Sequence, residues 1–385
     1  MRAGEHEVVV VGGGPAGAGA AALLAPSGCR TLLIEKEAAA RHKICGEFLS
    51  VEAQACLRAL GVDARALGGI PVGQVRLVHG RSVAEARLPF EGVSLTRKVL
   101  DEALLRRAAE QGARIRRGIA VREIAPAGSG LALTLSGGEE VRASTLFLAT
   151  GKHDVRGAKR PSVAGSNELI GFKRYFRLCR AQARALDGTT EVILFGGGYA
   201  GLQLVEGGMA NLCLLARRRL FERLGRTWEA LLAHLLDTAP HLGDRLAGAD
   251  AVLERPLAIY RVPYGFVHDA GAAQANGLFR LGDQVGVIPS FAGDGMAIAL
   301  HTGRLAAMTY IERGDAASAF HRQVREDIEG PIRLASMLQR ASEAPLGRSA
   351  LLVLCRTFPT IIREIATRTR LPEQALRRTG LSRGR

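Results

Sequence analysis

The pattern of apolar and polar positions changes several times along the chain, and each change predicts a different element. β-branched residues at 8–11 predict a buried strand, and the small residues at 18–24 that follow predict a closely packed helix. Apolar positions over 100–111 share one helical face, and Gly112 ends this helix. Two-residue alternation over 73–95 and 168–216 predicts antiparallel strands, whereas 226–237, 242–248 and 313–385 are helical in pattern.

The order of these elements predicts how the chain is divided. Strand–helix units at the start of the chain resume at 277–309, so the strand-rich segments interrupt one α/β fold rather than follow it. We expect a discontinuous nucleotide-binding domain (1–75, 97–165 and 272–312) with an inserted antiparallel-sheet substrate domain. That insert comprises 76–96 and 166–271, and a helical, basic region of 313–385 follows.

A glycine motif lies between the first predicted strand and helix. Gly12, Gly14 and Gly17 fit G-x-G-x-x-G: the first allows a tight turn, the second lets the backbone approach a pyrophosphate, and the third lets helix and strand pack closely. The helix N-terminus then offers free N–H groups to the phosphates. The next strand ends at Glu35, an acidic residue suited to a ribose 2′-hydroxyl. The segment therefore predicts a Rossmann-like dinucleotide site.

A second, distant element indicates which dinucleotide binds. A predicted strand at 278–281 leads into Gly282 and Asp283, then into a Pro/Gly loop at 289–296 and a helix of small residues. The Asp283 carboxylate can accept hydrogen bonds from the hydroxyls of a sugar-like chain. The helix N-terminus can stabilise negative charge on the N1/O2 edge of a flavin. A nicotinamide enzyme has no need for this element, so we expect FAD.

These segments, with the basic loop at 41–46 and Arg97 before a helix, resemble the FAD-dependent dehydrogenase and geranylgeranyl-reductase-like flavoproteins. That family lies within the p-hydroxybenzoate-hydroxylase-type superfamily, and the resemblance covers about residues 5–310. It implies an α/β fold with a Rossmann-like, GR2-type FAD domain. We expect the cofactor to be non-covalent, because no His or Cys sits in a recognised attachment motif. The cofactor-binding residues it implies are Gly12, Gly14, Pro15, Ala16, Gly17, Glu35, Lys36, Arg41, Arg97, Thr150, Gly151, Gly282, Asp283, Gly293, Gly295 and Met296.

The chain departs from two branches of the superfamily. Where the hydroxylase branch usually carries Gly-Ala-Asp-Gly, this chain has Ala149-Thr150-Gly151-Lys152, which disfavours aromatic hydroxylation. The Trp-x-Trp signature of flavin halogenases is absent, because Trp228 is the only tryptophan. Halogenation is disfavoured for that reason.

Two residues of the 41–47 loop are catalytic candidates. The resemblance places Cys45 beside the isoalloxazine, where a thiol with basic neighbours Arg41 and Lys43 can donate a proton or tune the flavin. The alternative is a small buried apolar residue. Reductase relatives often have Cys-Gly-Gly, whereas here Glu47 follows Gly46. Glu47 is a candidate acid on the substrate side, or a loop hydrogen bond.

The middle segment offers candidates for the substrate pocket. Residues 196–201 also fit G-x-G-x-x-G, but no helix of useful length follows, so we interpret 199–215 as a hairpin around 206–209 rather than a nicotinamide site. Phe172, Tyr175, Tyr199 and Pro289 are candidate substrate-binding residues, with core packing as the alternative.

Charge and composition limit the kinds of binding partner that the chain is expected to have. The formal net charge is +15, but aromatic residues are only 5%, so stacking platforms for nucleic acid are scarce. Six cysteines form no C-x-x-C and lie at no zinc spacing to histidine, so we expect reduced thiols, no metal and a cytoplasmic location. No apolar run approaches the roughly 18 residues of a membrane span.

The Arg-rich tail, which ends at Arg385, also carries apolar clusters at 351–354 and 361–365. A basic amphipathic helix of this kind can lie peripherally on the anionic inner membrane surface. The alternative is a helix packed on the nucleotide domain with its basic face in water.

Three functions are consistent with these observations. The preferred one is a FAD-dependent oxidoreductase of the dehydrogenase or reductase type, transferring hydride through flavin N5 to or from a lipophilic small molecule. The first alternative is an NAD(P)H-dependent monooxygenase that hydroxylates or epoxidises a small molecule. The second is a non-catalytic flavoprotein or an electron-transfer protein with a redox partner. NAD(P)H is a candidate transient electron donor.

Overall fold

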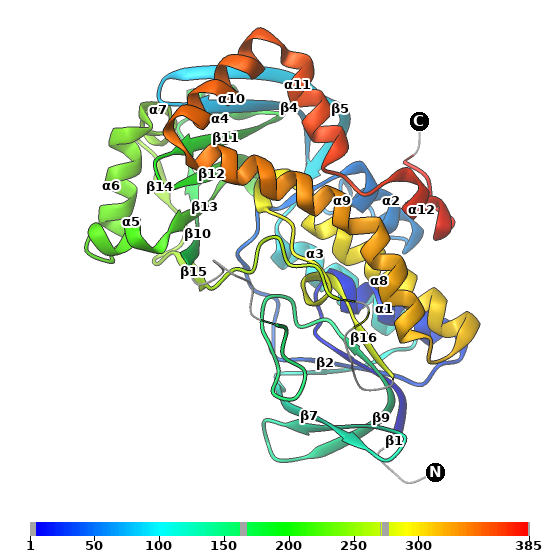
Figure 1. Cartoon of the computed structure of the whole chain (residues 1–385). Helices are drawn as coiled ribbons and strands as arrows, with labels where there is room; N and C mark the ends of the chain where they lie inside the picture. Colours follow the sequence, from blue (N-terminus) through cyan, green and yellow to red (C-terminus); the bar gives the residue numbers. More distant parts are fainter. Residues whose placement is uncertain (1–4, 162–167, 270, 272–276, 384–385) are drawn as a thin grey trace.

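A computed structural model describes residues 5–161, 168–269, 271 and 277–383. It has two sheets, with helices packed on both, and confirms the expected α/β class with a helical C-terminal region (Figure 1). The domain boundary predicted at 165/166, residue 272 of the one predicted at 271/272, and Arg385 lie outside the described residues.

The first sheet is the nucleotide-binding one. Its order is β6-β2-β1-β9-β8-β7, and β16 pairs with β9. β6, β2, β1, β9 and β16 run parallel to one another, whereas β8 pairs antiparallel with both β9 and β7. The strands are β1 (Glu5–Val11), β2 (Thr31–Glu35), β6 (Arg114–Arg117), β7 (Val121–Ala127), β8 (Gly130–Leu135), β9 (Glu140–Leu148) and β16 (Leu278–Arg280).

Small residues let the helices of this domain approach one another closely. α1 (Pro15–Leu24) is buried along nearly its whole length between α3 (Arg97–Glu110) and α8 (Gly295–Arg313). A side chain at Gly303 of α8 would lie 2.3 Å from the carbonyl oxygen of Ala16, so only glycine permits this contact. α2 (Val51–Ala59) also packs against α8 and begins at Ser50, whose hydroxyl accepts the N–H of Ala53.

The second sheet has the order β14-β10-β13-β12-β11-β4-β5-β3, with β15 beside β10. All its pairs are antiparallel except β4 with β11. The strands are β3 (Phe48–Leu49), β4 (Ile70–His79), β5 (Ser82–Ser94), β10 (Leu169–Arg177), β11 (Thr189–Phe195), β12 (Gly198–Val205), β13 (Met209–Arg217), β14 (Asp250–Ala251) and β15 (Leu257–Tyr260). β4 begins at Ile70, within the part that the sequence pattern assigned to the nucleotide domain.

Successive side chains along the strands of this sheet point to opposite faces, and each face packs against a different layer. Ile193 and Phe195 face a core under α5 (Arg218–Arg223), α6 (Trp228–Thr238) and α7 (Pro240–Leu246), whereas Val192 and Leu194 face a cavity on the other side. α4 (Arg180–Leu186) borders β12. The residues that fit a second glycine motif belong to the β11–β12–β13 meander, with Val205 opposite Met209, which confirms the hairpin interpretation.

The C-terminal helices contact strands of both sheets. α9 (Ala317–Glu343) packs on α8, while α10 (Pro345–Thr357) and α11 (Pro359–Arg368) lie against β4 and β5 (Figure 1). α10 and α11 therefore cover the substrate sheet rather than the nucleotide domain. α12 (Glu373–Arg378) packs back on α9, where Arg378 pairs with the buried Asp327.

Candidate cofactor and substrate site

The glycine loop after β1 combines two packing glycines with one that faces open space. A Cβ at Gly12 would lie 2.3 Å from the Ala149 carbonyl oxygen, and one at Gly17 would lie 2.0 Å from the oxygen of Gly12. A Cβ at Gly14 would meet only the guanidinium of Arg97, at 3.2 Å, and Gly14 borders a large cavity. The space over Gly14 is what a pyrophosphate needs in order to reach the backbone N–H groups of α1.

The carboxylate of Glu35 is oriented toward this loop. Its Oε2 accepts the N–H of Gly13 at 2.6 Å, and its Oε1 accepts the N–H of Glu37 at 3.0 Å. Gly13, Glu35 and Arg41 line a small second cavity, and Arg41 forms an ion pair of 2.7 Å with Glu37. Lys36 lines neither this cavity nor the large one; its ammonium lies 3.9 Å from Glu37 and is partly exposed.

Arg97 is the first residue of α3, and its guanidinium is fixed beside the glycine loop. It donates two hydrogen bonds to Asp101, at 2.7 and 2.9 Å, and Lys43 reaches the same carboxylate at 2.8 Å. Burial disfavours the charged form of Arg97, but the interactions with Asp101 favour it more strongly. The pKa of Arg97 is therefore raised. A fixed cation at Gly14 suits an anionic pyrophosphate.

The turns after β9 and β16 meet at the other end of the cavity. Asp283 forms an ion pair of 3.1 Å with Lys152, a residue that the sequence pattern did not single out. Burial alone would lower the pKa of Lys152. The interactions with Asp283 act in the opposite direction, and the pKa is raised overall. The Gly151 carbonyl accepts a hydrogen bond of 2.8 Å from Gln284, while the Thr150 hydroxyl closes its own turn and does not border the cavity.

The Pro/Gly loop before α8 is held from outside by the C-terminal tail. Gly293, Gly295 and Met296 border the cavity. The buried carboxylate of Asp294, next to them, accepts hydrogen bonds from Ser50 (2.9 Å), the N–H of Leu371 (2.9 Å) and Arg370 (3.2 Å). Burial raises the pKa of Asp294 to about 6. The tail thus helps to position the loop on which the flavin is expected.

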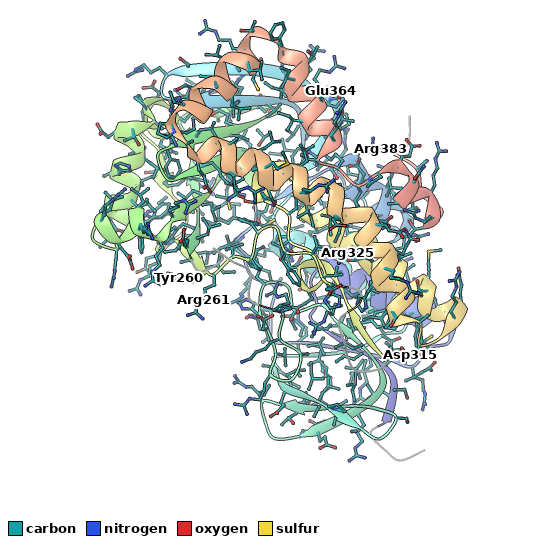
Figure 2. The ribbon with its side chains drawn as sticks, in the orientation of Figure 1. Tyr260, Arg261, Asp315, Arg325, Glu364 and Arg383 are labelled. Carbon is teal, nitrogen blue, oxygen red and sulfur yellow. The ribbon has the colours of Figure 1, made fainter. Side chains whose placement is uncertain are left out.

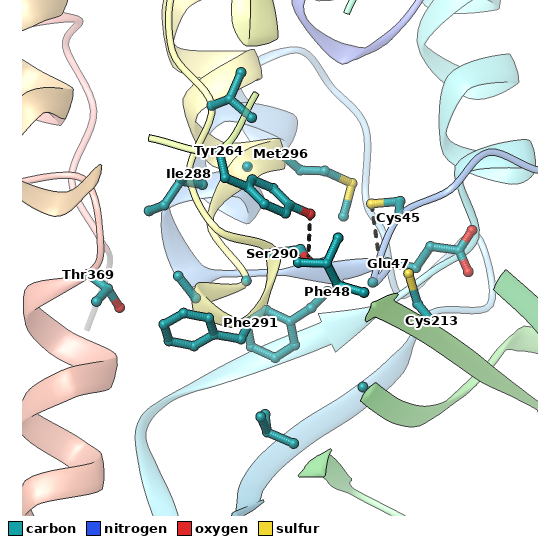
Figure 3. Close-up of a pocket in the computed structure, with 18 of the residues that line it drawn as sticks. Cys45, Glu47, Phe48, Cys213, Tyr264, Ile288, Ser290, Phe291, Met296 and Thr369 are labelled. Atoms are coloured by element: carbon teal, nitrogen blue, oxygen red, sulfur yellow. Dashed lines mark hydrogen bonds between the residues drawn. The ribbon is translucent and has the colours of Figure 1, made fainter. Parts of the chain in front are cut away.

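The thiol of Cys45 is partly exposed in the wall of the cavity, and its Sγ accepts the N–H of Glu47 at 3.3 Å (Figure 3). The loop around it is tied to the second sheet. Asn211 of β13 donates to the Cys45 and Gly46 carbonyls at 3.2 and 3.0 Å, and Gln203 of β12 donates to Gly46 at 2.9 Å. These bonds hold the thiol against the second sheet.

Glu47 lies beneath this loop, and its carboxylate has no exposed surface. It forms an ion pair of 2.6 Å with Lys173, which is equally buried, and accepts hydrogen bonds from Tyr175 (2.8 and 2.9 Å) and Asn211 (3.1 Å) and from the N–H of Arg97 (2.8 Å). Burial raises the pKa of Glu47, while Lys173 opposes that shift. Glu47 borders the cavity, but its carboxylate already accepts from four donors, so the structure favours the alternative of a loop hydrogen bond over an acid on the substrate side.

The four residues predicted to bind substrate lie in different parts of the structure. Tyr199 borders the cavity, and its hydroxyl lies 2.5 Å from that of Ser290. Phe172 is on the opposite face of the sheet, where its ring packs against Phe221 and Trp228 at centroid distances of 5.0 and 5.9 Å, so the pocket role expected for it is wrong. Tyr175 is buried against Glu47, and Pro289 is buried without bordering the cavity.

The large cavity has a volume of about 300 Å³ and continues from the expected cofactor residues to the C-terminal helices. Its far walls are mainly apolar (Figure 3). They include Val75, Leu77, Leu88, Val192, Leu194, Leu215, Ile259, Val262, Ile288, Phe291, Leu338, Leu351, Ile362 and Ile365. A single space therefore joins a cofactor-binding end to an apolar end.

Three residues of this site carried no motif in the sequence. Lys152 follows the Thr-Gly turn, and Lys173 lies in the middle of a strand between Phe172 and Arg174. Arg370 lies in an Arg-rich tail where nothing distinguishes it from its neighbours. Only Lys173 offered a signal, since a lysine at a buried strand position requires an anionic partner.

The comparison with known proteins agrees with this geometry. Residues 6–211, more than half of the chain, match the family of pyridine nucleotide-disulphide oxidoreductases, and the chain belongs to this FAD-binding family. It is 26% identical over 345 residues to menaquinone reductase of Mycolicibacterium smegmatis, covering 83% of this chain and 80% of that protein.

Solved structures show the same fold. A geranylgeranyl bacteriochlorophyll reductase-like protein from Thermoplasma acidophilum superposes with a TM-score of 0.74 at 20% identity, over 97% of this chain and 95% of the other. A halogenase variant solved with FAD gives a TM-score of 0.70 at 15% identity, over 88% and 77%. The resemblance to geranylgeranyl-reductase-like flavoproteins is confirmed, and the protein is a FAD-dependent oxidoreductase. Among the described residues, no helix is both long and apolar enough to cross a bilayer.

Proposed function

We propose that the protein is a FAD-dependent reductase of a lipophilic, unsaturated small molecule of the quinone or prenyl class. The observation that carries the proposal is the continuous cavity, which begins at Gly14 and Cys45 and ends among the apolar side chains of β4, β11 and the C-terminal helices. An apolar space of this kind suits a hydrocarbon substituent rather than a charged substrate. The similarity to a menaquinone reductase over most of the chain supports the same substrate class.

The residues around the cavity fit FAD. Gly14 and the N-terminus of α1 would hold the pyrophosphate with Arg97, Asp283 the ribityl hydroxyls, and the N–H groups at 293–296 the pyrimidine edge of the flavin. FAD supplies hydride chemistry at N5 when bound, with NAD(P)H as the proposed donor.

Cys45 is the side chain we assign to proton transfer. Reduction of a double bond requires a proton in addition to a hydride. Cys45 is a thiol in the cavity wall, and the cations of Arg97 and Lys152 line the same cavity. Both cations interact electrostatically with Cys45, so positive charge lies near the site of proton transfer. Water then returns the proton to the sulfur. Glu47 and Lys173 act as positioning residues, because they hold the loop from below.

The test uses the FAD-loaded protein under anaerobic conditions. The flavin is reduced with NADPH or dithionite and mixed with a quinone that carries a prenyl chain, and the flavin absorbance is followed in a stopped-flow instrument. Reoxidation by the quinone without oxygen is expected. A hydroxylated product formed only with oxygen would refute the proposal in favour of a monooxygenase. Reoxidation only by a redox protein would refute it in favour of electron transfer.

A matched pair of variants tests the role of Cys45. Cys45→Ala should slow product formation from an alkene acceptor by about 10²-fold or more, the usual range for loss of a positioned acid. Cys179→Ala removes an exposed thiol at the start of α4, outside the cavity, and should leave the rate unchanged. Equal rates for the two variants would exclude Cys45 as the proton donor.

A further inference from the structure

The outer face of α10 is unusually apolar for a surface helix. Five of the eight large apolar side chains that the described residues expose lie within 337–358. Leu346 is 87% exposed, Val353 62% and Phe358, directly after the helix, 54%. Three of the five are in α10, with Met337 in α9 and Phe358 directly after α10. Scattered apolar side chains on a surface need no explanation, but so many within one short stretch of chain mark a contact with something apolar.

The two faces of α10 have different surroundings. At 100° per residue, Leu346, Ala350, Val353 and Leu354 share one side of the helix, and all four are exposed. On the opposite side, Leu351, Leu352 and Cys355 are buried or half-buried against β4, β5 and the cavity. A helix that is apolar on both sides is normally enclosed on both sides. Nothing in the described chain covers the outer side.

The charge around this face identifies the occupant. Between 333 and 370, five arginines are exposed against one exposed acidic residue, Glu364, which lies at the outer edge of α11 (Figure 2). Arg356 borders the apolar side of α10 itself. Exposed apolar side chains flanked by arginines match a bilayer with anionic headgroups. The apolar side chains enter the acyl-chain boundary, and the arginines bind the lipid phosphates. The net charge of +15 adds to the attraction.

We propose that α10 and α11, with the end of α9, form a docking surface for an anionic lipid bilayer. The inference rests on the proposed function for its purpose, since only a lipophilic substrate needs it. α10 and α11 lie at the end of the molecule opposite the N-terminus (Figure 1), and their inner sides line the cavity through Leu351, Ile362 and Ile365. One layer of helix therefore separates the bilayer from the substrate space. A prenyl chain would pass between these helices and the sheet without crossing water.

The test is flotation of the FAD-loaded full chain with vesicles. Vesicles of phosphatidylcholine with phosphatidylglycerol should carry the protein, and pure phosphatidylcholine or high salt should release much of it. The triple variant Leu346→Glu, Val353→Glu, Phe358→Glu should lower the partition coefficient at least tenfold, since it removes about three apolar anchors. Arg356→Gln should lower it about fivefold.

The control variant Ile311→Glu changes another exposed apolar residue, on α8, and should float like the wild type. Reduction of a water-soluble quinone should be the same for all these variants, because none of the changed residues borders the cavity. The proposal is overturned if the wild type stays unbound at low salt, or if the triple variant floats equally well. It is also overturned if sedimentation shows a dimer that the triple variant abolishes, since the face would then belong to a second copy.

Vesicle binding without reduction of any quinone would support the docking surface while refuting the proposed reaction. The two proposals therefore fail separately.

Discussion

Replacing Lys173 with methionine should destabilise the protein strongly, because it leaves the carboxylate of Glu47 buried without its cation. Both side chains of this pair have no exposed surface, and they approach to 2.6 Å. Removing one partner of such a pair typically costs about 3–5 kcal/mol. The hydrogen bonds from Tyr175, Asn211 and the N–H of Arg97 remain, so we expect a value near the lower end, about 3 kcal/mol.

The pH dependence follows from the direction of the pKa shift. Burial already raises the pKa of Glu47, and loss of Lys173 removes the main opposing influence, so the variant carboxyl has a still higher pKa. A group with a raised pKa in the folded state favours folding most at low pH and loses that contribution as the pH rises through the folded pKa. The difference between the variant and the wild type should therefore be largest at neutral pH and shrink on acidification.

The assay is urea unfolding followed by the fluorescence of Trp228 and by circular dichroism. The matched control is the double variant Glu47→Gln, Lys173→Met, which should recover most of the lost stability because no uncompensated charge stays buried. A coupling energy of at least about 1.5 kcal/mol is expected from the cycle. Additive effects of the two single variants would refute the account of Glu47 as a buried, paired positioning residue.

Three further predictions test other parts of the structure. Gly14→Ala should weaken FAD binding, measured by titration, while leaving the melting temperature of the apoprotein within a few degrees, because the added Cβ meets only the Arg97 side chain. Phe172→Ala should lower the free energy of unfolding by about 3–5 kcal/mol without changing KM for the substrate, because its ring packs away from the cavity. Burial tends to raise the pKa of Glu191, but hydrogen bonds from His241 and Arg245 hold it at about 2, against 4.5 ordinarily. This pKa shift corresponds to about 3 kcal/mol of folding stability. Glu191 should therefore stabilise the wild type above pH 4.5, and this contribution should disappear as the pH falls toward 2. The variant Glu191→Gln should show a flatter pH–stability curve over this range.

Short-range patterns determined much of the fold. The glycine loop, Glu35 at the end of β2 and Asp283 after β16 could be placed from the sequence, because each follows directly from a strand–turn–helix unit whose geometry is local. The β12–β13 hairpin was predictable for the same reason, since its turn and its two strands are adjacent in the chain. Such features depend on a few neighbouring residues and survive in any tertiary context.

Tertiary structure alone decided which side chains meet. Glu47 and Lys173 are 126 residues apart in the chain, and Asp294 and Arg370 are 76 apart, so no local pattern links them. The alternation of β10 showed that Phe172 and Lys173 face opposite ways. Only the packing of α5 and α6 on one side and of the 41–47 loop on the other decided which of them enters the helix-covered core and which meets the loop. Strand periodicity specifies two faces; what covers each face depends on how distant layers assemble around the sheet.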